Sequence, residues 1–192
     1  DIVGLVRRFD KATSSSCGNG WVGGYNGSNI SGSVDFGYFT ASHGTSDGSF
    51  CSERTIGHEI GHNLGQNHDI ATNDNARDGA HSYSHGYRVT PAGSNGFYTV
   101  MAYRDGSQVP ALTFSNPNVT RTDCANQACG AADADVARTL NITLPGAAAW
   151  FRPADELVRD IASTRGHFEV TLSGLPALTN ERWRIEYTGS GR

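Results

Sequence analysis

The side chains best suited to metal chemistry lie between residues 58 and 69, in the run HEIGHNLGQNHD. Residues three or four apart share one face of a helix, so a helix here lets His58 and His62 present both imidazoles to a single ion. Glu59 then lies one position round from the first histidine, where its carboxylate can hold a water molecule rather than the ion. The pattern therefore predicts zinc-assisted hydrolysis.

The residues after the second histidine predict a third ligand. Gly65 suits a left-handed conformation that ends the helix and turns the chain back, which would bring His68 to the same ion. Three neutral imidazoles leave the fourth position of a tetrahedral zinc ion open, as in catalytic sites. One alternative is a polar helix and loop with coincidental histidines. Another is a non-haem iron site in which Asp69 supplies a carboxylate ligand, although His68 fits better.

The pattern HExxHxxGxxH followed by a methionine resembles the metzincin clan of zinc endopeptidases. By this resemblance Met101, the single methionine of the chain, lies in a turn that forms a hydrophobic floor under the zinc ligands. Asp69, after the third histidine, is similar to the reprolysin branch, and Tyr103 is similar to the astacin and serralysin turn. Bacterial reprolysin-like enzymes, including the peptidyl-Asp metalloendopeptidases, combine both features, and segments 114–119 and 134–141 also resemble that group.

This resemblance implies a function as a secreted zinc-dependent endopeptidase. Zinc would polarise the scissile carbonyl while Glu59 accepts a proton from a zinc-bound water and passes it to the leaving amine. Tyr103 would donate a hydrogen bond to the oxyanion or approach the zinc; a half-buried aromatic is the alternative. If the resemblance extends to specificity, an arginine would bind an aspartate after the scissile bond, with Arg104 the first candidate and Arg88 and Arg121 behind it.

The competing interpretation is a non-catalytic zinc-binding or adhesive fragment of a larger secreted protein, which would bind zinc without hydrolysis. A peptidase requires a polypeptide substrate. The chain has 15 Lys and Arg residues against 19 Asp and Glu and a formal net charge of −4, with its arginines scattered, which argues against a nucleic-acid partner. No apolar stretch has the length needed to cross a bilayer, which argues against a membrane partner.

The resemblance also implies the fold: α+β and zincin-like, with a twisted mixed sheet packed on the active-site helix and a C-terminal helix. Residues 2–6 form an apolar run typical of a buried strand, and residues 17–24 indicate a loop and edge strand. Residues 34–40 alternate as a half-buried strand should. In metzincins the strand before the active helix borders the substrate, so this segment is the expected peptide-binding edge.

Two helices are predicted. The first covers residues 55–64 and carries the histidine pair. The second covers residues 131–144 and is stopped by Pro145 and Gly146.

We expect residues 1–152 to form the catalytic domain. Residues 153–192 would be a linker and the start of a β-rich downstream module, with strands at 168–172 and 183–187. Metzincins carry further strands and helices before the strand that matches residues 2–6. The sequence therefore predicts an N-terminally truncated fold, for which an upstream segment of the same precursor is a candidate partner.

Four cysteines favour two disulfides formed in an oxidising, extracellular compartment, and they permit three pairings. Cys124 and Cys129 most simply close a small loop, which leaves Cys17 to reach Cys51. Free buried thiols are the alternative.

Two further metal sites are weaker candidates. An oxygen-rich stretch could hold calcium, although a solvated loop is the simpler interpretation; its residues are Asp69, Asn73, Asp74, Asn75 and Asp78. His81 and His85 have helical spacing, but the glycines and serines around them favour a turn over a second zinc site.

Overall fold

The computed structural model describes residues 2–73, 78–90 and 95–150, together with three later strands. The chain divides into two compact units, Asp1–Trp150 and Phe151–Arg192. All residues of the expected site lie in the first unit.

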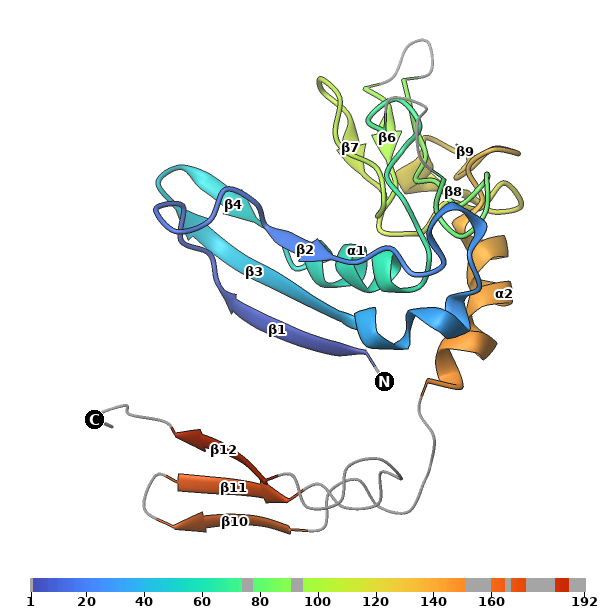
Figure 1. Ribbon diagram of the computed structural model, residues 1–192. Coiled ribbons are helices and arrows are strands. Elements are labelled where there is room, and N and C mark those ends of the chain that lie inside the picture. The colour runs from blue at the N-terminus through green and yellow to red at the C-terminus, as the bar shows by residue number, and fades with distance from the viewer. Residues whose placement is uncertain are drawn as a thin grey trace. The chain divides into compact units, whose positions relative to one another are not determined.

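The first unit is built on a four-stranded sheet of mixed direction (Figure 1). β1 (Val3–Arg8) runs parallel to the central strand β3 (Tyr38–Ser46), and β2 (Gly18–Gly20) runs antiparallel to β3 on its other side. β4 (Ser49–Cys51) folds back on the end of β3. Asp47 and Gly48, both with positive φ, form the two-residue turn between these strands. β2 is therefore an edge strand.

Helix α1 (Arg54–Asn63) lies against the sheet along β2 and β3 (Figure 1). Its last residue, the fully buried Asn63, donates hydrogen bonds from its amide to the carbonyls of Trp21, Phe36 and Tyr38 at 3.0–3.3 Å. These bonds fix the helix end relative to the strands, because a buried amide left without partners would cost free energy. The helix predicted at residues 55–64 is confirmed to within one residue at each end.

The rest of the first unit consists of short elements around a second helix. The 3₁₀ helices are η1 (Tyr25–Gly27), η2 (Ile30–Phe36) and η3 (Thr122–Cys124). The short strands are β5 (Arg88–Val89), β6 (Phe97–Tyr98), β7 (Val109–Pro110), β8 (Thr120–Arg121) and β9 (Gln127–Ala128). Helix α2 (Val136–Ala148) packs against η2, and just beyond it the Trp150 indole donates a hydrogen bond to the Ile30 carbonyl at 2.9 Å.

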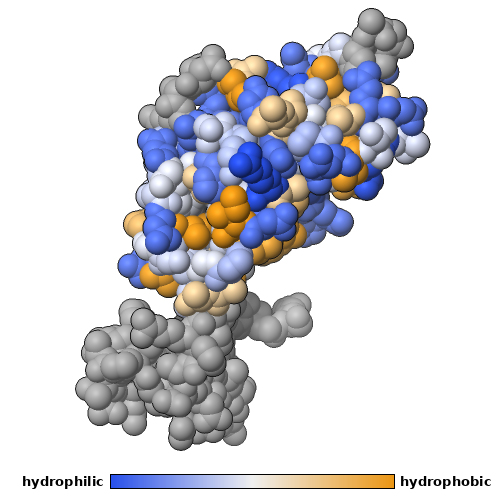
Figure 2. All heavy atoms as spheres, turned by 90° about the vertical axis from the view of Figure 1, so that its right-hand side faces the viewer, coloured by the Kyte–Doolittle hydropathy of each residue, from blue (hydrophilic) through white to orange (hydrophobic). Residues whose placement is uncertain are grey.

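The first unit therefore has a mixed α+β architecture with two small apolar clusters. One combines Ile30, Leu64, Ala147 and Trp150; the other combines Phe97, Ala111 and the cystine of Cys124 and Cys129. On the face that Figure 2 shows, the described hydrophobic residues form small groups among polar ones. Among the described residues, no helix is long and apolar enough to cross a membrane.

The predicted disulfides are confirmed. Cys17 pairs with Cys51, which ties the residue before β2 to β4, and Cys124 pairs with Cys129. The first of these bonds closes a loop that ends three residues before α1.

The strand predicted at residues 2–6 forms as β1, but its predicted burial is wrong. All six residues of β1 are exposed, with Val3 at 66% and Leu5 at 62%. β1 is the outer strand on its side of the sheet, and no described element covers its faces. An apolar run in the sequence shows that a strand would be stabilised by burial. It does not show whether another element packs against that strand.

The predicted peptide-binding edge at residues 34–40 is also wrong. Its first half belongs to η2, and its second half begins β3, which has β1 on one side and β2 on the other. The edge is instead β2, within the stretch 17–24 that the glycines mark as loop and edge strand. The prediction came from the position of this segment before the helix, by resemblance, and strand order is a long-range property that such a position does not determine.

The second helix begins and ends later than predicted. The Asp135 side chain accepts a hydrogen bond from the backbone N–H of Arg138 and caps the helix at residue 136, while Ala131 and Ala134 form a turn. Pro145 lies inside the helix rather than ending it. The helix continues for three more residues, so a proline marks a probable boundary and not a certain one.

The second unit contains a three-stranded antiparallel sheet of β10 (Asp160–Thr164), β11 (His167–Thr171) and β12 (Arg182–Glu186). β11 and β12 match the two predicted strands to within one residue, and β10 was not predicted. The linker expected from residue 153 onward lies mostly outside the described residues.

Candidate metal centre

Three histidines meet at one point. His58 and His62 lie on successive turns of α1, and His68 comes from the loop that follows. The Nε2 atom of His68 lies 3.1 Å from that of His62 and 3.2 Å from that of His58. A tetrahedral zinc ion with bonds of about 2.0–2.1 Å holds its nitrogen ligands about 3.3 Å apart. The three residues could therefore hold such an ion, and they form the only such group of His, Cys, Asp or Glu among the described residues.

Backbone carbonyls orient the two helix histidines. His58 Nδ1 lies 2.8 Å from the Val100 carbonyl, and His62 Nδ1 lies 2.9 Å from the Gln66 carbonyl. Carbonyls only accept hydrogen bonds, so both Nδ1 atoms carry protons and both Nε2 atoms present lone pairs. Burial lowers the pKa of His58 to about 4 and that of His62 to about 3, which keeps both rings neutral.

These tautomers suit the cluster to a cation. The single Nε2 atom of His68 could donate a proton to one neighbour at most. At least one of the two short contacts therefore places lone pair against lone pair. A metal ion among the three nitrogens would turn that repulsion into coordination.

The turn that delivers His68 forms as predicted. Gly65 has φ +91°, in the left-handed region, and its N–H bonds to the His62 carbonyl at 2.9 Å. A Cβ atom at Gly65 would also lie 2.7 Å from the Cβ of Ala80. Both the conformation and the space at this position favour glycine.

Met101 lies under the helix, fully buried. A Cβ atom at Gly61 would collide with its sulfur, so Met101 packs directly against the α1 backbone beside His62. Burial and this packing contact are what the structure shows for Met101.

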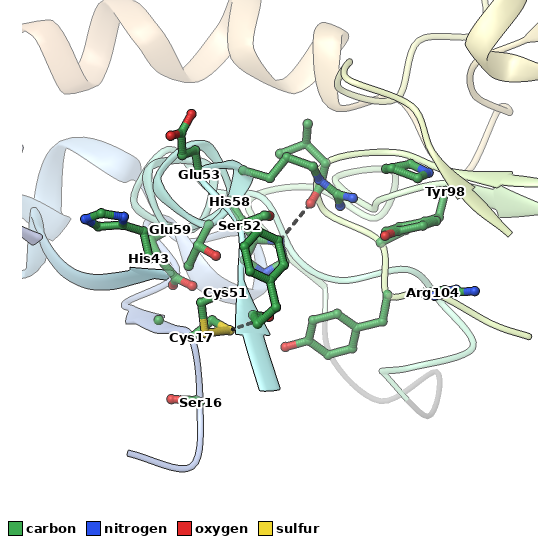
Figure 3. A pocket seen from close by; sticks show the side chains of 18 of the residues that line it. Ser16, Cys17, His43, Cys51, Ser52, Glu53, His58, Glu59, Tyr98 and Arg104 are labelled. Carbon is green, nitrogen blue, oxygen red and sulfur yellow. Dashed lines mark hydrogen bonds between the residues drawn. A yellow bond between two sulfur atoms is a disulfide. The ribbon is translucent and has the colours of Figure 1, made fainter. Parts of the chain in front are cut away.

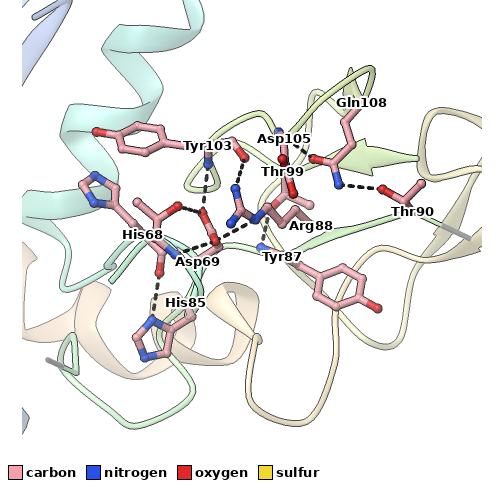
Figure 4. Close-up of polar contacts among 11 residues, drawn as sticks. His68, Asp69, His85, Tyr87, Arg88, Thr90, Thr99, Tyr103, Asp105 and Gln108 are labelled. Atoms are coloured by element: carbon pink, nitrogen blue, oxygen red, sulfur yellow. Dashed lines mark hydrogen bonds and ion pairs between the residues drawn. The ribbon is translucent and has the colours of Figure 1, made fainter. Parts of the chain in front are cut away.

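A buried carboxylate joins the His68 loop to the turn that follows Met101 (Figure 4). Asp69, 2% exposed, pairs with Arg88 Nε at 2.9 Å and accepts the Tyr103 N–H at 3.0 Å. Its oxygens also accept the N–H and hydroxyl of Thr72 at 3.0 and 2.7 Å. Arg88 in turn donates to the Tyr103 carbonyl at 3.3 Å. Asp69 is thus committed to this network rather than to an ion, which removes the iron alternative. For calcium, Asp74 and Asn75 lie outside the described residues.

Glu59 borders an open cleft of about 1180 Å³ that also exposes His58 and Tyr103 (Figure 3). Only 4% of Glu59 is exposed, and burial raises its pKa to about 7. The glycines of β2 create its space. A Cβ atom at Gly18 would collide with the Glu59 carboxylate, and one at Gly20 would lie 3.0 Å from the Glu59 carbonyl.

Two other predicted residues, Tyr103 and Arg104, also line the cleft, but they make different contacts there. The ring of Tyr103 is tilted against that of His68, with centroids 4.4 Å apart, and nearly parallel to that of His58, with centroids 5.8 Å apart. Arg104 lines the same cleft, but its Nε donates to the Gly106 carbonyl at 2.9 Å and its side chain extends away from His58 in Figure 3. Arg54, which the sequence interpretation missed, also lines the cleft.

His85 is not part of the histidine cluster but contacts the backbone of His68. Its Nδ1 lies 2.8 Å from the His68 carbonyl, and its Nε2 lies 3.6 Å from an oxygen of Asp78. His81 and His85 form no second metal cluster within the described ranges. Their spacing in the sequence carried no signal of this supporting contact.

Comparison with known proteins decides the family. Residues 1–134 match the model of the metallo-peptidase family M12B, reprolysin-like. The chain belongs to this family. The match spans α1, all three histidines and the turn at Met101.

Two relatives of the reprolysin-like chain are named peptidyl-Asp metalloendopeptidase. One, from Pseudomonas aeruginosa, is 34% identical over 173 residues, which cover 80% of this chain and 26% of the relative. The other, from Stenotrophomonas maltophilia, is 42% identical over 67 residues, which cover 34% of this chain and 16% of the relative. The chain thus corresponds to about a quarter or less of their length. No solved structure matches it.

Proposed function

We propose that this chain is the catalytic part of a zinc-dependent endopeptidase. The observation that supports this most is the group of three Nε2 atoms at zinc-ligand spacing, beside a buried glutamate in an open cleft. In this proposal His58, His62 and His68 hold the ion and Glu59 is the general base. When bound, zinc would supply Lewis acidity to a water molecule and to the scissile carbonyl.

The protein residues have distinct roles in this mechanism. Glu59 accepts the proton from the attacking water and passes it to the leaving amine, and its low exposure keeps bulk water from competing. Tyr103, whose ring contacts those of His58 and His68, lines the same cleft and would donate a hydrogen bond to the oxyanion from its phenol. Met101 supports the α1 backbone from below.

The edge of β2 is the proposed track for the substrate. Ser16, Cys17 and Gly18 line the cleft, and in the described part of the chain β2 pairs only with β3. An extended peptide could add to this open edge through backbone hydrogen bonds, which position its scissile carbonyl whatever its side chains.

The names of the relatives support a preference for aspartate after the scissile bond. The two disulfides also support an extracellular place of action. We include both in the proposal.

The proposed position of Glu59 can be tested by adding a methyl group beside its side chain. We expect Gly18→Ala to lower the hydrolysis rate ten- to a hundredfold, since the added methyl group displaces the Glu59 carboxylate and small displacements of catalytic groups are costly. The free energy of unfolding should fall by about 1–3 kcal/mol, because the buried Glu59 side chain has to move from its Cγ atom outward. Gly32→Ala is the matched control, since a Cβ atom there meets nothing within 4 Å. Equal rates for the two variants would contradict the proposed position of Glu59.

Metal removal tests the function itself. The 192-residue chain is freed of metal with a chelator, and one portion is reloaded with zinc. Both portions then digest an unfolded protein, and mass spectrometry identifies the new peptide termini. We expect cleavage only by the reloaded portion, with aspartate at the new N-termini. Bound zinc without any cleavage would favour a non-catalytic fragment. Cleavage without a preferred residue would contradict only the proposed preference for aspartate.

A further inference from the structure

Arg54, the first residue of α1, leaves most of its hydrogen-bonding capacity unused. Its Nε is buried and has no partner, and one terminal nitrogen reaches the Thr99 carbonyl at 3.5 Å, a long contact. The guanidinium lies over the Tyr98 ring, 4.5 Å from its centroid. A planar cation is thus held on one face by an aromatic ring while its N–H edge remains largely unpaired.

The other arginines near the site are engaged. Arg88 pairs with Asp69, Arg121 pairs with Asp123, and Arg104 donates to a carbonyl. Arg54 forms no ion pair among the described residues, although Glu53 is its neighbour in sequence. A partly buried guanidinium without a carboxylate has an unfavourable desolvation cost. An anion from outside the chain would offset it.

The position of Arg54 relates it to the zinc ligands. It precedes His58 by four residues, so both lie on the same face of α1, about 6 Å apart along the axis. Consecutive residues of an extended substrate are about 3.8 Å apart, so the spacing between these two helix positions corresponds to one or two substrate residues.

The mostly apolar residues that line the cleft with Arg54 favour an interaction between its guanidinium and a carboxylate. Tyr98, Val100, Pro110 and Leu112 line the same part of the cleft and are mostly apolar. Low polarity strengthens the attraction between a guanidinium and a carboxylate.

We propose that Arg54 is the specificity-determining residue that binds the carboxylate of an aspartate after the scissile bond. This inference rests on the function proposed above and assigns its substrate preference to one residue. The guanidinium fork can donate two parallel hydrogen bonds to a carboxylate, while Tyr98 holds its plane. Asparagine has the same shape but no charge, and it can match only part of this pattern.

The first test compares hydrolysis of two peptides that differ only in Asp or Asn after the scissile bond. In Arg54→Gln we expect kcat/KM for the Asp peptide to fall ten- to a hundredfold, with the Asn peptide little changed. Arg54→Lys, which keeps the charge but not the fork, should be intermediate. Arg138→Gln is the matched control, because Arg138 also stacks on a tyrosine, Tyr83, outside the cleft.

Arg104→Gln separates the two candidate arginines. Loss of the Asp preference in Arg54→Gln with retention in Arg104→Gln is the expected result. The reverse pattern would overturn the inference and assign the role to Arg104.

A binding measurement tests the role of Arg54 independently of whether the chain hydrolyses peptides. Calorimetry with zinc-loaded chain compares the tripeptide amide Asp-Ala-Phe with Asn-Ala-Phe, which both resemble the product after cleavage. We expect at least tenfold tighter binding of the Asp peptide, lost in Arg54→Gln. Equal binding of the two peptides by the unsubstituted chain would overturn the role of Arg54, even if hydrolysis is observed. If the chain prefers the Asp peptide in binding but hydrolyses neither substrate, the carboxylate-binding role of Arg54 is supported and the proposed peptidase function is contradicted.

Discussion

Glu59→Gln is expected to lower kcat a hundred- to ten-thousandfold while leaving zinc bound. Glutamine has nearly the same shape, so the close approach of Gly18 and Gly20 to this side chain is preserved. The amide cannot accept a proton from water, and a positioned general base contributes a factor of this size. Initial rates on a fluorogenic peptide give kcat, and the zinc content of the purified protein gives occupancy.

Glu53→Gln is the matched control for this prediction. Glu53 lines the same cleft only six residues earlier, but it is exposed and occupies the N-cap position of α1, where its side chain makes no capping hydrogen bond. The identical chemical change there should leave kcat within about threefold, as expected for an exposed position. If Glu59→Gln keeps more than a tenth of the rate, another group must accept the proton, and the proposed role of Glu59 fails.

The sequence predicted the centre of this site because its geometry is local. Helical spacing places His58 and His62 on one face, and the left-handed Gly65 returns the chain so that His68 meets them. The cystine of Cys124 and Cys129 was equally predictable, since these residues are five positions apart. In each case a few consecutive residues determine the contact.

Features that depend on distant pairing were not predictable. The carbonyls of Val100 and Gln66 orient the histidines, but a backbone atom leaves no residue-type signal. Residues 34–40 were assigned to the edge by resemblance to metzincins, and neither that resemblance nor the alternation of side chains reveals the strand order of this chain. Arg54 was missed for a similar reason: its distinguishing property is the absence of a partner, which appears only once Arg88 and Arg121 are seen to be paired.

Asp69 was noticed as a mark of a subfamily, while its physical role is to hold two loops together. The loop that carries His68 and the turn that carries Tyr103 share no regular strand pairing. They meet at one carboxylate, which accepts hydrogen bonds from both (Figure 4). The site's geometry therefore depends on a buried charge, and this dependence leads to the second large prediction.

Asp69→Ala is expected to lower the free energy of unfolding by about 3–5 kcal/mol, because it leaves the largely buried Arg88 without its counter-ion. It also removes the acceptor of the Tyr103 N–H, so zinc affinity should fall about ten- to a hundredfold, as when a group that orients metal ligands is lost. Urea unfolding of the metal-free chain measures the first effect, and competition with a zinc indicator measures the second. Asp123→Ala, at the exposed pair with Arg121, should change both quantities far less.

A double-mutant cycle identifies the cause of that loss. Arg88→Met alone leaves the carboxylate of Asp69 buried with its bonds to Thr72 and Tyr103 but without its charge partner. With Arg88→Met already present, Asp69→Ala should cost less than it does in the unsubstituted chain, because no unpaired guanidinium then remains. It should still weaken zinc binding, since the Tyr103 N–H has lost its acceptor in either background. Additive changes in unfolding free energy would mean that the ion pair contributes little, and that the hydrogen bonds to the two loops account for the role of Asp69.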